Sequence, residues 1–322
     1  MAGFGLLFGS AAHAQSIPFS SNELYPEGLA YHSADKTFFV SSIHHGRIGR
    51  VDRRGAYRPF VEDEALVSSL GLAVDDTRNR LLVCVADPGV STRTNAATQG
   101  KLAKLAIYDL KTGKRTALVD LGGLSEGGHF ANDVAVAPDG TAYVTDSFSP
   151  QVWQVTPEGK ASVLVRNDQF TGEGFNLNGI VYHPAGYLLL AKSNDGKLFK
   201  LDPRHPEHLE TVATPALLGA DGLVLNNRNE LLIIQNGTGK ITRLSSADQW
   251  GTATVQATTA SEKTFPTTGT WAQDHYYVLN AKLNEIFDPK APRTSDFLIQ
   301  QVPSDGQPTG RAGQSSSHGQ SR

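Results

Sequence analysis

Six segments of the chain share one pattern, and this repeat limits the possible folds more than any other feature of the sequence. Each segment reads as a short apolar strand, a polar turn and a second apolar strand. The six segments are EGLAYHSADKTFFVSS from Glu27, LGLAVDDTRNRLLVCV from Leu70, NDVAVAPDGTAYVTDS from Asn132, NGIVYHPAGYLLLAKS from Asn178, DGLVLNNRNELLIIQN from Asp221 and TGTWAQDHYYVLNA from Thr268. Because such units cannot bury their apolar faces alone, neighbouring units must pack on one another.

The segments also predict how many strands each unit has. Turn residues such as Asp139-Gly140 and Ala185-Gly186 join the two apolar runs, as expected of hairpins. A third run and a shorter fourth run follow most hairpins, for example QVWQVT and ASVLV. Residues 17–302 then divide into six units of about 48 residues, a length typical of propeller blades. We therefore predict an all-β fold, a six-bladed β-propeller with four antiparallel strands per blade, forming a single domain. The last outer strand is either the segment from Phe297 to Val302 or the N-terminal IPFSS.

Composition narrows the classes of partner. The formal charge of −3 and the pI near 6.4 give no electrostatic basis for binding nucleic acid or an anionic membrane. No apolar run is long enough to span a bilayer. We expect a monomer that acts on a small-molecule substrate. The single cysteine, Cys84, lies in the apolar run LLVCV and is expected to be a buried, inert thiol.

Both ends of the chain differ from the repeat. An apolar stretch precedes Ala12-His13-Ala14, an A-x-A pattern typical of a signal-peptidase site, although no Lys or Arg precedes that stretch. We expect residues 1–14 to be a signal peptide, truncated if the true start lies upstream, and the mature protein to be exported, periplasmic or secreted. The polar residues 303–322 are expected to be a disordered tail.

Oxygen-bearing side chains occur at one phase of the repeat, directly before the inner apolar run. They are Glu27, Asn132 with Asp133, Asn178 and Asp221, from four different units. Inner strands of a propeller lie side by side along its channel, so these residues should meet at one end of that channel. Carboxylates brought together without Lys or Arg would repel one another unless a cation neutralised them. An all-oxygen set favours Ca²⁺, with Mg²⁺ or Mn²⁺ as alternatives, and argues against Zn²⁺.

The motifs PEGLAY, FANDVAV, LNGIVY and ADGLVL, in this order and spacing, resemble the SMP-30/gluconolactonase/LRE-like family over about residues 23 to 290. More distantly they resemble the paraoxonases. The resemblance implies a calcium-dependent hydrolase of lactones or related esters in which Glu27, Asn178 and Asp221 hold the metal. It also implies that Asn132 contacts the metal directly or through water.

Two features depart from the paraoxonase pattern. Gly28 stands where paraoxonases have an acidic ligand of a second, structural Ca²⁺. Their second-blade histidine corresponds to the stretch VADP, which contains Asp87. The histidine-dyad mechanism therefore does not transfer to this chain, and Asp133 alone is weak support for a second metal.

Residue roles follow from these comparisons as expectations. Asp221 is the first candidate for the general base and Asp87 the reserve candidate, while His129 and Asp133 are candidate substrate contacts. Substrate specificity should come from the loop of residues 87–101 and from the stretches GGHFA and TGEGF.

Other interpretations stay open beside this one. The stretch from Gly123 to Gly127 fits the G-x-S-x-G pattern of a nucleophile elbow around Ser125, but no helix pattern follows it. A lone histidine in a loop, such as His129, is more often simply solvated. The alternative to the hydrolase is a non-catalytic propeller, in which the cation only stabilises the ring and the channel binds a ligand or partner.

Overall fold

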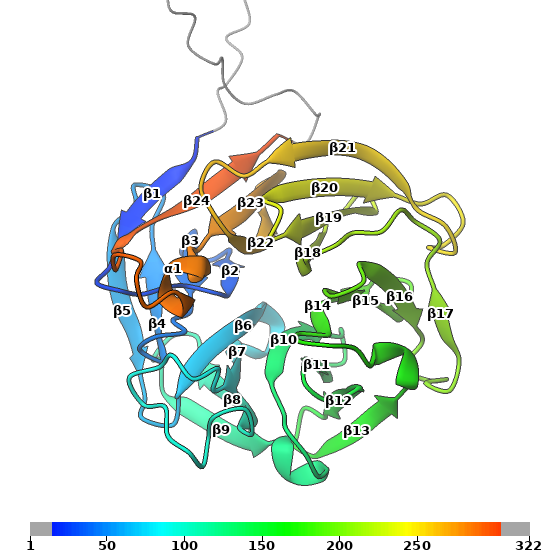
Figure 1. Cartoon of the computed structure of the whole chain (residues 1–322), viewed down its shortest axis with the longest axis horizontal. Helices are drawn as coiled ribbons and strands as arrows, with labels where there is room; N and C mark the ends of the chain where they lie inside the picture. The colour runs from blue at the N-terminus through cyan, green and yellow to red at the C-terminus, as the bar shows by residue number, and fades with distance from the viewer. Residues whose placement is uncertain (1–14, 304–322) are drawn as a thin grey trace, which may run out of the picture.

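The computed structural model describes residues 15–303, and in this part of the chain six four-stranded antiparallel sheets surround a central channel (Figure 1). The prediction of a six-bladed β-propeller is therefore confirmed. The predicted signal peptide, and all of the predicted tail except its first residue, lie outside the described residues.

Each blade runs from an inner strand beside the channel to an outer strand at the rim. From inside to outside, the blades consist of β2 (Leu29–His32), β3 (Thr37–Val40), β4 (Arg47–Val51) and β5 (Tyr57–Glu62); β6 (Ser68–Asp75), β7 (Arg80–Ala86), β8 (Ala103–Asp109) and β9 (Arg115–Asp120); β10 (Ala131–Val136), β11 (Ala142–Asp146), β12 (Gln151–Val155) and β13 (Ala161–Arg166); β14 (Leu177–His183), β15 (Tyr187–Lys192), β16 (Lys197–Leu201) and β17 (Leu209–Thr211); β18 (Ala220–Leu225), β19 (Glu230–Gln235), β20 (Lys240–Ser245) and β21 (Thr254–Ala260); β22 (Pro266–Ala272), β23 (His275–Asn280), β24 (Asp296–Val302) and β1 (Ile17–Ser20).

The last blade shows how the ring closes. β24 pairs with β23 on one side and with β1 on the other, so that Ile17 lies opposite Ile299. The N-terminal strand is therefore the outer strand of the blade, and the segment from Phe297 to Val302 is its third strand. Because β1 and β24 pair in one sheet, strands from the N-terminal and C-terminal parts of the chain close the ring within this blade.

Irregular pairing recurs near the start of the inner strands. In five of the six blades the register between the first and second strands shifts, and the shifts fall between Ser69 and Leu72, Ala131 and Val134, Leu177 and Ile180, Ala220 and Leu223, and Pro266 and Gly269. A bulge bends the strand and re-aims the side chains within it. Four of the polar positions that the repeat identified, Asn132, Asp133, Asn178 and Asp221, lie in these bulges, whereas Glu27 precedes β2, whose pairing with β3 is regular.

Close approach of neighbouring inner strands explains the glycines at this phase. A Cβ atom on Gly179 would lie 2.2 Å from the carbonyl oxygen of Asp221, and one on Gly222 would lie 2.5 Å from the Cα of Thr268. No larger residue fits without moving the backbone of the next blade. Glycine therefore lets the inner strands pack tightly around the channel.

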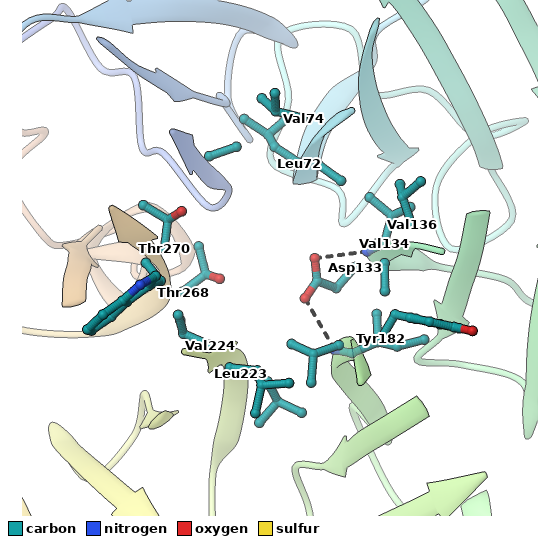
Figure 2. Close-up of a pocket in the computed structure, with 18 of the residues that line it drawn as sticks. Leu72, Val74, Asp133, Val134, Val136, Tyr182, Leu223, Val224, Thr268 and Thr270 are labelled. Atoms are coloured by element: carbon teal, nitrogen blue, oxygen red, sulfur yellow. Dashed lines mark hydrogen bonds between the residues drawn. The ribbon is translucent and has the colours of Figure 1, made fainter. Parts of the chain in front are cut away.

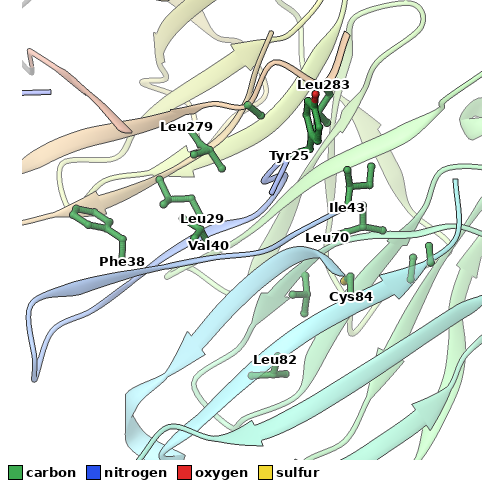
Figure 3. Close-up of a cluster of buried hydrophobic side chains, with 14 of the residues drawn as sticks. Tyr25, Leu29, Phe38, Val40, Ile43, Leu70, Leu82, Cys84, Leu279 and Leu283 are labelled. Atoms are coloured by element: carbon green, nitrogen blue, oxygen red, sulfur yellow. The ribbon is translucent and has the colours of Figure 1, made fainter. Parts of the chain in front are cut away.

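Apolar side chains between the blades form the core. One cluster joins the first, second and last blades through Leu29, Leu70 and Leu279, among others (Figure 3). Cys84 lies in this cluster with no exposed surface, and burial raises the pKa of its thiol well above the ordinary range. The expectation of a buried thiol is confirmed.

Helical segments are short and lie in the connections. They are η1 (Asp76–Arg78), η2 (Gly122–Leu124), η3 (Asp168–Phe170) and the five-residue helix α1 (Leu283–Phe287). Helix α1 lies in the connection between β23 and β24 and contributes Leu283 and Phe287 to a cavity described below. None of the helices between residues 15 and 303 has the length and apolarity needed to cross a membrane.

Candidate functional site

A cavity of about 260 Å³ lies at the end of the channel where the inner strands begin. Its polar lining includes four of the predicted residues, Glu27, Asn132, Asn178 and Asp221, all nearly buried. Their sequence positions span almost two hundred residues, yet the shared phase of the inner strands brings them together. The predicted convergence of these four side chains is therefore seen in the fold.

A repeated hydrogen-bond pattern orients the two asparagines. The amide nitrogen of Asn132 donates to Ser147 Oγ at 2.8 Å, and Ser147 Oγ donates to the carbonyl oxygen of Leu177 at 2.6 Å. In the next blade the amide nitrogen of Asn178 donates to Ser193 Oγ at 3.1 Å. Because a serine hydroxyl has one proton, Ser147 can only accept from the amide, and this contact fixes the orientation of Asn132.

The pKa values of the two carboxyl groups in the cavity are strongly raised. Burial raises the pKa of Glu27 well above its usual range, and the nearby Asp221 and Asp133 raise it further. Burial raises the pKa of Asp221 to about 8, with Asp133 adding to the effect, while the hydrogen bond from Asn236, at 2.9 Å, acts in the opposite direction. None of the described residues that line this cavity is Lys, Arg or His. When these carboxyl groups ionise, their negative charges have no cationic partner among the described lining residues.

Two buried oxygen atoms of the cavity residues accept no hydrogen bond from the protein. They are Glu27 Oε2 and Asn132 Oδ1. Such atoms are rare in folded proteins, because a buried acceptor without a partner is costly. Among the described residues no three His, Cys, Asp or Glu side chains cluster as a metal site, so any cation here would need amide oxygens as well. Carboxylate and amide oxygens together suit a hard divalent cation.

Asp133 faces a different part of the channel. Its carboxylate accepts hydrogen bonds from its own neighbour Val134, N to Oδ1 at 2.9 Å, and from the backbone nitrogen of Ile180, to Oδ2 at 3.3 Å (Figure 2). It lines a second cavity, of about 500 Å³, formed by the inner strands beyond the site. Burial raises the pKa of Asp133 to about 7. This position does not match a substrate contact in the smaller cavity, although its charge acts on Glu27 and Asp221.

Asp87 is buried within the loop that follows β7. Its carboxylate accepts hydrogen bonds from Thr94 Oγ1 and Thr98 Oγ1, both at 2.6 Å, and from the backbone nitrogen of Gly89 at 2.9 Å. These contacts shape the loop and place Pro88 against the cavity. Asp87 itself does not line the cavity, because its carboxylate is turned toward its own loop. Its position supports an anchoring role rather than that of a reserve base.

His129 is buried beside the third blade, and this position does not match a substrate contact. Its ring contacts Asp146 Oδ2 through Nδ1 at 2.7 Å and the carbonyl oxygen of Ser125 through Nε2 at 2.9 Å. Since both partners are acceptors, both nitrogens donate when the ring is protonated, and the hydrogen bond with Asp146 raises the pKa of His129.

The same geometry argues against the interpretation of Ser125 as the nucleophile of an elbow motif. Ser125, His129 and Asp146 lie together as the members of a hydrolase triad would, with Ser125 Oγ 3.5 Å from His129 Nε2. Because Nε2 donates to a carbonyl oxygen, it cannot accept the hydroxyl proton of Ser125. No strand-to-helix turn is present here either, since the segment from Leu121 leads through η2 into β10. These three residues therefore form a structural network.

Sequence reasoning did not identify several lining residues. Asn236 and Ser193 stand fifteen residues after Asp221 and Asn178, directly after the second strand of each blade, and this constant spacing was a usable signal. The apolar wall comprises Ile43, Leu70, Pro88, Phe130, Phe175, Phe265, Leu283 and Phe287. Of these, Pro88, Phe130 and Phe175 lie in the loop of residues 87–101 and in the stretches GGHFA and TGEGF, which the sequence predicts to set specificity. The others come from β6, α1 and connections of unequal length and had no such signal.

Comparisons with known proteins place this geometry in context. The family model described as SMP-30/Gluconolactonase/LRE-like region matches residues 25–282. Among solved structures, the chain is similar to the Malassezia sympodialis allergen Mala s 1, with 18% identity, 90% of this chain and 96% of that chain covered and a TM-score of 0.71. A gluconolactonase from Xanthomonas campestris matches with 16% identity, 89% of each chain covered and a TM-score of 0.60. A luciferin-regenerating enzyme matches with 12% identity, 91% and 98% covered and a TM-score of 0.62. At these identities the structures show the fold alone. No curated protein sequence matches the chain.

Proposed function

Since the chain belongs to the SMP-30/Gluconolactonase/LRE-like family, we propose that it is a metal-dependent hydrolase of a lactone or related ester. The observation that carries this proposal is the set of side-chain oxygens of Glu27, Asn132, Asn178 and Asp221 that converge in the cavity. We call this polar part of the lining the floor of the cavity. Two of these oxygens, Glu27 Oε2 and Asn132 Oδ1, are buried without a partner. A gluconolactonase among the structural neighbours supports the same reaction class.

The cation, Ca²⁺ with Mg²⁺ or Mn²⁺ as alternatives, would be held by Glu27, Asn132, Asn178 and Asp221. Such an ion supplies Lewis-acid chemistry: it polarises a carbonyl oxygen and lowers the pKa of water. The serines behind the asparagines keep the amide oxygens turned toward this position. The protein thus provides an oriented, all-oxygen floor.

Asp221 is the proposed general base. It lines the cavity beside the other proposed cation ligands, so it would lie near a water that the cation activates. Burial and the nearby Asp133 raise its pKa in the metal-free site, and a bound cation would lower that pKa. The hydrogen bond from Asn236 at 2.9 Å holds the carboxylate in place. The aromatic walls, including Phe130 and Phe175, limit access of bulk water to this carboxylate.

The test is hydrolysis of a panel of γ- and δ-lactones, followed by proton release, with added Ca²⁺ and again after chelation. Turnover should disappear with the chelator and return with Ca²⁺. Asp221→Asn should abolish turnover, whereas Glu64→Gln, which changes an exposed carboxyl, should leave it unchanged. A folded Asp221→Asn protein with full activity would contradict the proposal.

One observation favours a second candidate, a non-catalytic propeller with a structural cation. The four proposed ligands come from four different blades, so that a bound ion would cross-link the ring. In that case Ca²⁺ would raise the melting temperature strongly, and no lactone, ester or phosphotriester would be turned over.

A further inference from the structure

The walls of the candidate site are apolar, while its polar groups are confined to the floor. Eight apolar residues surround the floor, and four of them are phenylalanines: Phe130, Phe175, Phe265 and Phe287. Phe175 and Phe287 are 41% and 47% exposed, so large apolar surfaces remain open to the cavity mouth. Exposed aromatic surface gathered around one concave site indicates that an apolar ligand covers it.

Ring packing and hydrogen bonds hold one of these walls in position. The rings of Phe130, Phe148 and Phe175 pack together with centroids 5.1 to 5.3 Å apart. Buried Asp146 Oδ1 accepts hydrogen bonds from the backbone nitrogens of Phe130 at 2.9 Å and Phe148 at 3.1 Å. Asn176, next to Phe175, ties its own loop to Gly172. The wall is therefore held in place before a ligand arrives, which lowers the entropy cost of binding.

Apart from the oxygens that would hold the cation, the floor offers few free groups to a ligand rich in hydroxyl groups. One N–H of each amide is already used: Asn132 donates to Ser147, Asn178 to Ser193 and Asn236 to Asp221. Ser193 Oγ already donates to the carbonyl oxygen of Ala220. Hydroxyl groups that faced the phenylalanine walls would lose their hydrogen bonds with water and gain none.

The charge and the volume of the cavity further limit the class of ligand that it can bind. The lining contains the carboxyls of Glu27 and Asp221 and no Lys, Arg or His among its described residues, so it has no partner for an anionic substituent. The volume of about 260 Å³ lies at the small end of ligand cavities. A compact, uncharged molecule suits both features.

We propose that the substrate is an uncharged lactone or ester carrying an alkyl or aryl group, rather than a polyhydroxylated sugar lactone. This inference rests on the proposed hydrolase function and names its substrate class. The ester group lies at the polar floor, and the apolar group lies between the walls formed by Phe130 with Phe175 and by Phe265 with Phe287.

A matched pair of substrates tests the inference. γ-Nonalactone and glucono-1,5-lactone are similar in size and opposite in polarity, and the spontaneous hydrolysis of each is subtracted. kcat/KM should be higher for γ-nonalactone. In the series from γ-valerolactone to γ-nonalactone it should rise about fourfold per added methylene, which is about 0.8 kcal/mol for each buried CH₂. A flat series, or faster turnover of glucono-1,5-lactone, would overturn the substrate class and leave the hydrolase function intact.

A binding measurement separates this inference from the question of catalysis. The corresponding lactams are not expected to be turned over, so calorimetric titration with 5-pentylpyrrolidin-2-one and with glucono-lactam reports affinity alone. We expect the pentyl lactam to bind more tightly and with a negative heat-capacity change. That preference, seen in a protein without any turnover, would refute the hydrolase function and retain the apolar site. Tighter binding of glucono-lactam would refute the apolar site.

A substitution with a matched control completes the test. Phe175→Ser removes an exposed part of the wall and should reduce the gain per methylene to less than twofold. Val255 on β21 has a similar exposure, 39%, and does not line the cavity. Val255→Ser should keep the full gain. Equal effects of the two substitutions would show that Phe175 does not contact the ligand.

Discussion

Replacing Asp221 by asparagine should stabilise the metal-free protein at neutral pH and abolish its stabilisation by a cation. In the metal-free fold the pKa of Asp221 is about 8, against an ordinary value of 3.8, mainly because of burial. The folded protein therefore retains a proton that the unfolded chain loses above pH 4. Its free energy of unfolding falls by about 1.4 kcal/mol per pH unit across this window, which amounts to roughly 5 kcal/mol near pH 7.5.

Asparagine has nearly the same shape and no charge. Its side-chain oxygen can still accept the hydrogen bond from Asn236, so Asp221→Asn removes the cost of keeping a buried carboxyl protonated without opening a cavity. For a protein of this size, roughly 5 kcal/mol corresponds to a rise in melting temperature on the order of 10 °C. Above pH 8, where Asp221 is ionised, the substitution also removes its electrostatic repulsion of Glu27.

The assay is thermal unfolding between pH 5 and 8, with chelator and with saturating Ca²⁺. With chelator, the melting temperature of the wild-type protein should fall as pH rises, while that of Asp221→Asn should change less and lie higher at pH 8. Saturation at a hundred times Kd should add about 2.7 kcal/mol to the wild-type protein and little to the variant. Glu64→Gln is the control. A chelated Asp221→Asn protein that melts at or below the wild-type temperature at pH 8 would refute the reasoning.

Three further predictions follow from individual contacts. Asn178→Ala removes one oxygen from the floor and should weaken Ca²⁺ binding at least tenfold in a thermal titration, while the chelated protein melts within a few degrees of the wild type. His129→Gln should remove a pH-dependent change in the fluorescence of Trp153, whose ring lies 5.7 Å from that of His129. Because the pKa of His129 is raised in the fold, its stabilising contacts are complete below pH 6.5 and are lost as pH rises through its folded-state pKa. Asp87→Ala removes three hydrogen bonds and should lower the free energy of unfolding by about 2 to 3 kcal/mol, with faster tryptic cleavage after Arg93 as the local readout.

The repeat in the sequence was sufficient to predict the propeller and the phase of the site. Strands of one blade alternate their side chains regularly, so a residue such as Asn178 could be aligned with Asp221 without knowledge of the loops. The choice of the closing strand could not be made in this way. Both candidate segments are short and apolar, and only the pairing of Ile17 with Ile299 assigns the outer position to β1.

Side-chain direction in the loops was not predictable from sequence position. His129 stands three residues before Asn132, which suggested that it faced the channel. Its ring is instead held by Asp146, a buried residue at the end of β11 that accepts several hydrogen bonds. Asp87 is similar, since its carboxylate is held by threonines seven and eleven residues further along the chain. In both cases a hydrogen bond that the repeat pattern does not encode determines the position.

The oxygens of the site depend on contacts between blades. Ser147 donates its hydroxyl proton to the carbonyl oxygen of Leu177 in the next blade, and Ser193 does the same to Ala220. Each serine can then only accept from the asparagine of its own blade, which leaves the amide oxygen free to face the cavity. A blade that lost its neighbour would lose this constraint. The ring is therefore needed for the chemistry of the site as well as for stability, because packing between blades determines which atom of each amide the cavity receives.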